Sequence, residues 1–347
     1  MSATPSAASG GSLSGSPAGS RPGTLPGTAR GTTTRGEHAA SGTVGALEAP
    51  VESASARATR PGGRGPLGWL RRAGWRHVIG IVFSLYALLP IAYIVSVSLK
   101  PHGTLTGSNE LFIEFSFESY ARVLSDPAHP FGQWFLNSLL VGLCTAAGTV
   151  FLGALAAYSF SRMRFRGRRM GLLSLILLQM FPQLLAVVAV FLLVSKLGTI
   201  VPWLGVNSPA ALIAVYLGGA LGVNTYLMYG FFNTVPMSID EAAKLDGAGH
   251  ARIFFTIILR LVAPILAVVG LLSFIATMND FVISSVILVD PQKQTLAVGL
   301  YNMVSNPNYA DWSAFAAGAV MAALPVVIIF VALQRYIVGG LTAGSVK

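Results

Sequence analysis

The chain contains little that would support chemistry of its own. Its one cysteine, Cys144, excludes an intrachain disulfide, and its position in an apolar stretch indicates a packing role. There is no G-x-x-x-x-G-K-[ST] motif and no Gly-Lys pair, which excludes a phosphate-binding loop of the Walker type. There is no H-E-x-x-H motif, and the five histidines are not spaced as ligand pairs. We therefore expect no enzyme, no metal site and no cofactor in this chain.

Charge is also scarce, whereas apolar residues are abundant. Only 10% of the 347 residues are charged, 53% are hydrophobic and the mean hydropathy is +0.66. A helix of about 20 mostly apolar residues spans the hydrocarbon core of a membrane. Charge-free stretches of this length predict an all-α polytopic membrane protein. Its six transmembrane helices are expected at about 78–99, 135–160, 170–195, 210–233, 261–289 and 312–334.

The 23 Lys and Arg residues are distributed unevenly between the connecting segments. Placing both chain ends and the loops 162–169 and 238–264 in the cytoplasm satisfies the positive-inside rule. The basic residues then left outside are Lys100, Arg122, Lys196 and Lys293. The arginines of 162–169 and the net charge of +10 could suggest a nucleic-acid surface. Topology explains a short basic loop between spans, so no nucleic-acid partner is expected.

Residues 1–72 have a different composition from the rest of the chain. They contain no Phe or Tyr and are dominated by Gly, Ser, Ala, Thr and Pro. Such a segment buries too little apolar area to fold, which predicts a disordered cytoplasmic tail ahead of a transmembrane domain over 75–347. The first apolar run begins near residue 78 and has the length of a full span, so it is not a secretory signal. The role of the tail is open.

The segment 238–264, S-I-D-E-A-A-K-L-D-G-A-G-H-A-R-I-F-F-T-I-I-L-R-L-V-A-P, is a charged, glycine-containing hairpin between long apolar stretches. Ser238 and Glu241 have the spacing of a capping box, which predicts a short helix beginning at Ser238. Ala242 and Ala243 keep one face thin enough for another protein to approach. Gly247 or Gly249 can supply the left-handed turn that ends the helix. A second helix should start near Ala251, so the segment predicts a docking surface.

At this segment the chain resembles a known family. E-A-A-K-L-D-G-A (241–248) is similar to the EAA loop in permease subunits of bacterial ABC importers, the loop that couples to the ATPase. Further strings resemble the carbohydrate branch, of the maltose and maltodextrin type: A-A-Y-S-F-S-R-M-R-F-R-G (156–167), L-Q-M-F-P (178–182), L-L-S-F-I-A (271–276), Q-T-L-A-V-G-L (294–300) and V-G-G-L-T-A-G-S-V-K (338–347). The resemblance covers about 75–347. One departure is Arg260, where the family usually has proline, so Pro264 is expected to carry the bend.

The resemblance implies the type I ABC importer permease fold and a set of partners. These are an ATP-binding cassette ATPase dimer that binds ATP and Mg, a second and distinct permease, an extracytoplasmic solute-binding protein, membrane lipid and a carbohydrate. The residues implied in ATPase coupling are Ser238, Glu241, Ala242, Ala243, Leu245, Asp246, Gly247, Leu341 and Val346. The last two belong to the tail 338–347, which is too rich in glycine to form a stable helix alone and is expected to insert between ATPase subunits.

Polar residues inside the expected spans are few. Asn279 and Asp280 stand in the outer half of the fifth span, and an ionisable group there is a candidate for the substrate pathway. Hydrogen bonding within or between subunits is the alternative, and both roles stay open. The same alternatives hold for Gln179, Gln183 and Asn224, which are weaker candidates.

Two segments are expected on the outer side of the membrane. Residues 115–124 have the helical spacing of a helix at the membrane surface. The loop 290–311 is too long for a tight connection, and the resemblance implies contact with the solute-binding protein, with an interfacial connector as the alternative.

Taken with the topology, these patterns predict a subunit of the bacterial cell membrane with both ends in the cytoplasm. It would form half of the translocation pathway of an ATP-driven importer for a carbohydrate such as a maltodextrin. The alternative is a sugar carrier driven by an ion gradient, which would be expected to bury more charged residues in its spans. The sequence does not identify the sugar.

Overall fold

The computed structural model describes residues 74–101, 112, 114–305 and 310–343, with side chains as far as residue 337. Within these ranges every regular element is a helix, in agreement with the predicted fold class. The predicted tail 1–72 and Val346 lie outside the described residues.

Five helices of the described part of the chain are long and apolar enough to cross a membrane. They are α2 (Trp75–Ser98), α4 (Phe131–Arg162), α6 (Gln183–Ile200), α7 (Pro209–Phe232) and α14 (Trp312–Ala343). A sixth candidate is the bent pair of the segment His250–Leu261 and α11 (Ala263–Asn279). The predicted spans 78–99, 135–160, 210–233 and 312–334 correspond to α2, α4, α7 and α14.

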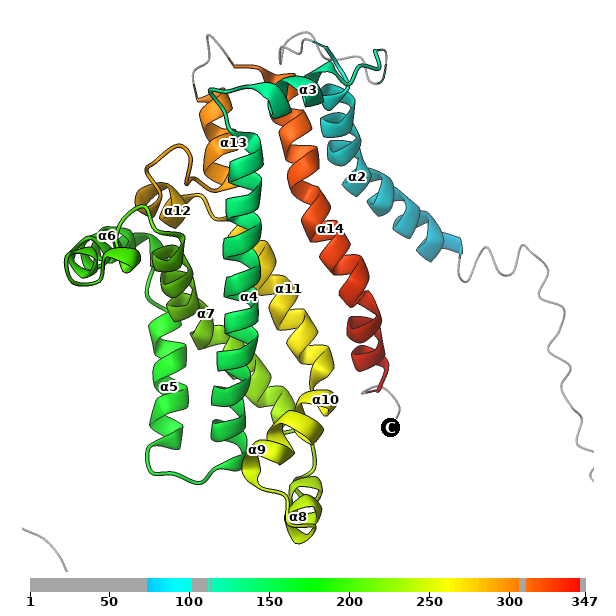
Figure 1. Ribbon diagram of the computed structural model, residues 1–347. Helices are drawn as coiled ribbons and strands as arrows, with labels where there is room; N and C mark the ends of the chain where they lie inside the picture. The colour runs from blue at the N-terminus through cyan, green and yellow to red at the C-terminus, as the bar shows by residue number, and fades with distance from the viewer. Residues whose placement is uncertain (1–73, 102–111, 113, 306–309, 344–347) are drawn as a thin grey trace, which may run out of the picture. The chain divides into compact units, whose positions relative to one another are not determined.

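Helix α4 packs against both α7 and α11, and α14 packs against α2 and α11 (Figure 1). Small residues on α4 allow this close approach. A Cβ added at Gly148 would lie 2.7 Å from Leu217 of α7, and one added at Gly142 would lie 2.9 Å from Phe274 of α11. Small residues at helix contacts are the usual means of close packing in membranes, where lipid is as apolar as the side chains. Helix α4 is therefore the central element of the bundle.

The predicted third span, 170–195, is wrong as a single helix. The chain forms α5 (Arg168–Gln179) and α6, and Figure 1 shows α5 alongside α4 but α6 nearly end-on. Pro182 explains the break, because it has no backbone N–H and disfavours helical geometry in Phe181 before it. The amides of Met180 and Phe181 bond instead to the carbonyls three residues back, at 3.1 and 3.3 Å, which tightens the end of α5.

The predicted fifth span, 261–289, is also divided. Three short helical pieces, α9 (His250–Arg252), the π-helix η4 (Ile253–Ile258) and α10 (Leu259–Leu261), precede a bend of 79° before α11. The bend lies at Val262, directly before Pro264 in the first turn of α11, as expected from the departure at Arg260. A second break at Asp280 separates α11 from α12 (Val282–Ile287).

The prediction that 338–347 does not form a helix is wrong for the described part of this tail, because α14 continues to Ala343. Extending an existing helix avoids the unfavourable nucleation step, so a long apolar helix can carry two glycines that cost about 1 kcal/mol each. At the opposite end of the bundle lie α3 (Glu118–Ser125), α13 (Leu296–Val304) and the short 3₁₀ helix η3 (Pro202–Leu204). Helix α3 falls within the predicted surface helix 115–124 except for its last residue.

Candidate functional site

The short helix α8 (Met237–Leu245) projects from the bundle beyond the ends of α4 and α7 (Figure 1). It begins one residue before the predicted start, after Pro236, and no side chain caps its N-terminus. Ser238 is thus the second helical residue instead of the N-cap, and the predicted capping box with Glu241 is wrong. Proline before the first turn fixes the entry of the chain by its own φ of −58°.

The C-terminus of α8 ends as predicted at Gly247, whose φ is +79°. The amide of Gly247 donates to the Lys244 carbonyl at 3.0 Å, and the amide of Ala248 donates to the Ala243 carbonyl at 2.9 Å. These two bonds are the pair that defines a Schellman motif. Gly249, the other predicted candidate, has a φ of −72° and needs no glycine for its backbone. Gly247 therefore sets the direction in which the chain leaves α8.

One face of α8 is open. Ser238, Glu241, Ala242 and Asp246 are exposed, and Leu245 is 90% exposed. Ala243 instead is buried, in a cluster with Tyr158, Met228, Phe232 and Phe254, so only one of the two alanines lies on the open face. Met237 of the same helix is 49% exposed, so two large apolar side chains stand beside exposed carboxylates on a helix that projects from the bundle, which suits contact with another protein.

The buried face of α8 carries an ion pair that sequence reasoning missed. The Arg162 guanidinium at the end of α4 approaches the Asp240 carboxylate, with 3.1 Å between Nε and Oδ2. Arg162 also donates from Nη2 to the Val235 carbonyl at 2.8 Å. Asp240 and Ala243 are three residues apart and share one helix face, which is the signal that could have placed Asp240 inward. Nothing in the local sequence identifies its distant partner.

A polar cavity of about 430 Å³ lies between α4, α5, α6, α7 and α11. It brings together four of the predicted pathway residues, Gln179, Gln183, Asn224 and Asp280, whereas the exposed Asn279 is not in its lining. Residues that sequence reasoning missed complete its polar wall: Thr145, Tyr216, Ser273 and Thr277. The volume falls within the range of about 300–1,000 Å³ that is usual for small-molecule sites.

Most polar groups of this cavity are already held in place. Tyr216 donates to Asp280 Oδ2 at 2.9 Å, Asn224 donates to Ser273 Oγ at 3.2 Å, and Gln179 donates to the Gly219 carbonyl at 2.9 Å. The hydroxyl of Thr145 is different, since it is buried and has no hydrogen-bond partner among the described residues. Buried polar groups are usually paired, so Thr145 leaves one wall of the cavity able to bind a hydroxyl group.

Asp280 combines the two roles that its sequence position left open. Its carboxylate accepts the amide of Ile283, in the first turn of the six-residue α12, at 3.2 Å. Its side chain also lines the cavity through its contact with Tyr216.

A larger depression of about 660 Å³ lies between α4, α11 and α14. Its lining includes one polar side chain, Tyr336, and is otherwise aliphatic or aromatic. A polar ligand would find almost no hydrogen-bond partner there, so the smaller cavity is the candidate site for such a ligand.

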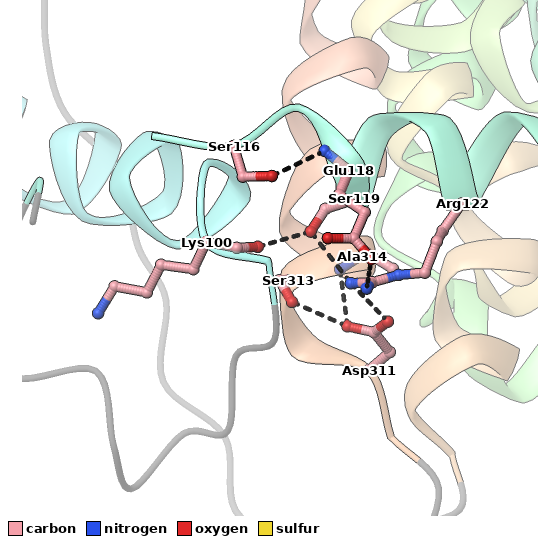
Figure 2. Close-up of polar contacts among 8 residues, drawn as sticks. All are labelled: Lys100, Ser116, Glu118, Ser119, Arg122, Asp311, Ser313 and Ala314. Atoms are coloured by element: carbon pink, nitrogen blue, oxygen red, sulfur yellow. Dashed lines mark hydrogen bonds and ion pairs between the residues drawn. The ribbon is translucent and has the colours of Figure 1, made fainter. Parts of the chain in front are cut away.

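Helix α3 lies at the end of the bundle opposite α8 (Figure 1), and a polar network joins it there to the ends of α2 and α14 (Figure 2). Arg122 of α3 binds Asp311 at 3.1 Å, and Asp311 caps α14 through the Ala314 amide at 3.0 Å. Ser119 donates to the Lys100 carbonyl at 2.7 Å, which attaches α3 to the end of α2. Residues 306–309 of the loop 290–311, for which contact with the solute-binding protein was predicted, lie outside the described residues.

Comparisons with known proteins agree with this architecture. Residues 149–342 match the family described as the binding-protein-dependent transport system inner membrane component. The chain is 40% identical over 282 residues to the galactooligosaccharides transport system permease protein GanQ of Bacillus subtilis, covering 78% of this chain and 97% of the relative. It is 38% identical over 281 residues to the maltose/maltodextrin transport system permease protein MalG of Escherichia coli K12, covering 78% and 94%.

A solved structure is similar as well. It is the crystal structure of a bacterial ABC transporter involved in the import of the acidic polysaccharide alginate, and one of its chains matches with a TM-score of 0.65 and 26% identity. The match covers 77% of this chain and 97% of that one. The predicted ABC permease is thereby confirmed against the alternative of an ion-driven carrier, and the chain belongs to the family of inner-membrane components of binding-protein-dependent transport systems.

Proposed function

We propose that this permease subunit forms half of the translocation pathway for an oligosaccharide and that α8 is the element on which an ATPase dimer acts. ATP and Mg bind to that ATPase and not to this chain. The relatives named for galactooligosaccharides and for maltodextrin support an oligosaccharide as the substrate class. They do not favour one of these sugars over the other.

The observation that carries the coupling role is the open face of α8. Leu245 is 90% exposed at the tip of a helix that the Schellman turn at Gly247 stops sharply. An exposed leucine has no favourable environment in water, but it becomes a good contact when a partner cleft covers it. Glu241 and Asp246 add charge on the same exposed helix, which suits the polar rim of such a contact.

Cross-linking tests this docking. In a chain with Cys144→Ser, the substitution Leu245→Cys places the single thiol on α8, and a thiol-specific cross-linker should join it to the co-expressed ATPase. Trp203→Cys is the matched control, since Trp203 is 65% exposed but lies in η3, away from α8. Absence of an adduct at position 245, or equal adducts at both positions, would contradict the proposal.

The sugar path is proposed to run along the polar cavity. A sugar presents hydroxyl groups that both donate and accept, which suits the mixed lining of carboxylate, amide and hydroxyl groups. The free hydroxyl of Thr145 and the carboxylate of Asp280 are the groups best placed to bind it. Since this subunit is proposed to form half of the pathway, a second and distinct permease would supply the other half.

The remaining partners follow from the two ends of the bundle. With both chain ends in the cytoplasm, α8 meets the ATPase and the network of Arg122 and Asp311 lies outside, where an extracytoplasmic solute-binding protein would dock. The tail with Leu341 and Val346 is proposed to contact the ATPase subunits as well. Membrane lipid would cover the exposed apolar surface of α2.

A further inference from the structure

The last turn of α4 makes polar contacts with α8 and with the segment that precedes it. The guanidinium of Arg162 and the carboxylate of Asp240 lie 3.1 Å apart, and their side chains are only 6% and 7% exposed. In the same turn, Ser161 donates to the side-chain oxygen of Asn233 at 2.8 Å. Arg162 donates in addition to the Val235 carbonyl. Polar contacts from two adjacent residues of α4 thus hold the chain both before α8 and within its first turn.

Stability alone does not account for this pair. Removing two charges from water is costly, and a buried ion pair is often no better than an apolar pair of the same size. The N–H of Arg162 Nε is not aligned for a hydrogen bond to the carboxylate, and neither carboxylate oxygen of Asp240 has a hydrogen-bond partner among the described residues. What the pair supplies, and an apolar contact would not, is a charge attraction between one particular residue of α8 and one of α4.

The position of Arg162 on α4 indicates where a movement of α8 would be passed on. Arg162 ends the helix that carries Thr145, and at a rise of 1.5 Å per residue the two positions are about 25 Å apart along α4. A helix is stiff over this length, so a displacement imposed on one end reaches the other. The chain continuing from α8 to α11 must instead pass a π-helix and a bend of 79°.

We infer that Arg162 and Asp240 are positioning residues for transport, which pass the displacement of α8 to α4 and so to the cavity wall at Thr145. The inference rests on the proposed coupling role of α8. The ion pair would then determine how much sugar is transported for each ATP hydrolysed, and this effect would be separate from any effect on assembly.

The first test replaces the ion pair by an apolar pair of similar size, Arg162→Met with Asp240→Leu, in the complete transporter in proteoliposomes. We expect normal assembly and basal ATP hydrolysis, but a ratio of sugar transported to ATP hydrolysed that falls about 2- to 30-fold, the range measured for residues that couple distant sites. Arg168→Met is the matched control, because Arg168 is also an arginine near the ends of α4 and α7, but it binds the Tyr229 hydroxyl of α7 and not Asp240. Its ratio should equal that of the wild type.

The possible results distinguish a failure of the proposed transport function from a failure of the role assigned to Arg162 and Asp240. A wild-type complex without ATP-dependent sugar transport would refute the proposed function. A wild-type complex that transports, with an unchanged ratio in the apolar variant, would overturn the inference alone. Arg162→Lys keeps the positive charge but lacks the fork that reaches both partners, so its ratio should lie between those of the wild type and the apolar variant.

A second measurement leaves Arg162 and Asp240 unchanged, so it can be made even if the apolar variant does not assemble. It records distances between spin labels. Spin labels are placed in a Cys144→Ser chain at the exposed Arg164, beyond α4, at Met237 of α8, and at Tyr336 of α14. When ATP closes the ATPase, the distance between labels 164 and 237 should stay constant while that between 237 and 336 changes. A change in the first distance, or constancy of both, would overturn the inference.

Discussion

Replacing Gly247 by valine should uncouple ATP hydrolysis from transport without preventing membrane insertion. The residue has a φ of +79°, and a Cβ built there would have nothing within 4 Å, so the cost of the substitution is conformational and not steric crowding by neighbours. A side chain in the left-handed region costs about 1–2 kcal/mol, and a β-branched one is especially unfavourable. At 1.4 kcal/mol per factor of ten, the native turn becomes about 5- to 30-fold less favoured.

In Gly247→Val, the loss of coupling should result from a change in the direction of the chain after α8. The two Schellman bonds would be exchanged for another exit from the helix, and the open face with Leu245 would be presented at a different angle. Since Gly247 lies outside the long apolar helices, the amount of protein in the membrane should not change. The assay is sugar-stimulated ATP hydrolysis of the purified complex, with membrane content measured by immunoblot.

Gly249→Val is the matched control for this experiment. Gly249 also has open space around it, but its φ of −72° is allowed for valine, so its activity should stay close to that of the wild type. Gly247→Asn should show sugar-stimulated ATP hydrolysis between that of the wild type and that of Gly247→Val, because asparagine tolerates the left-handed region. Normal stimulation in Gly247→Val, or an equal loss at position 249, would refute the reasoning.

Four further outcomes are expected. Asp280→Asn keeps an acceptor for the Ile283 amide but loses the charge, a difference of about 1 kcal/mol per hydrogen bond, so sugar uptake should fall about fivefold while basal ATPase activity stays intact. Equal loss of both would assign Asp280 to structure alone. Gly198→Ala in α6 should lower thermal stability by about 1–3 kcal/mol, since its Cβ would lie 2.6 Å from the backbone Cα of Gly205, whereas a Cβ at Gly218 in α7 meets nothing within 4 Å. Deleting residues 340–347 should reduce co-purification of the ATPase, and an unaffected complex would exclude the tail as a contact. Transport into vesicles supplied with constant ATP should be insensitive to an uncoupler, and collapse of uptake with the proton gradient would exclude ATP as the energy source.

The fold was predictable from sequence wherever the length of a charge-free stretch decides the outcome. Helices α2, α4, α7 and α14 were found in this way, because a long apolar segment has few alternatives to a spanning helix. The two divided spans were not found, although both contain a visible cause. Pro182 and Asp280 each stand within an apolar run, and whether such a residue kinks a helix or ends it depends on the packing around it.

The candidate sites were predictable to different degrees. Gly247 was identified because a glycine after a short helix has a direct conformational meaning. The grouping of Gln179, Gln183, Asn224 and Asp280 in one cavity was not expected, since they come from four separate segments. The pairing of Arg162 with Asp240 needs the tertiary structure, because one sequence carries no signal for a contact between such distant positions.

The bend between α10 and α11 gives the latter the geometry of a lever arm. Helix α11 is 17 residues long, which corresponds to about 25 Å at 1.5 Å per residue. Any part of the α8 displacement that does not pass through α4 arrives through α10, meets α11 at 79° and so acts across its axis. We expect this to rotate the helix about Val262, and a rotation of about 10° over that length would swing Asp280 at its far end by about 4 Å. Labels placed at the two ends of α11 should therefore show displacement relative to α4 that grows toward Asp280, and equal displacement at both ends would exclude the lever.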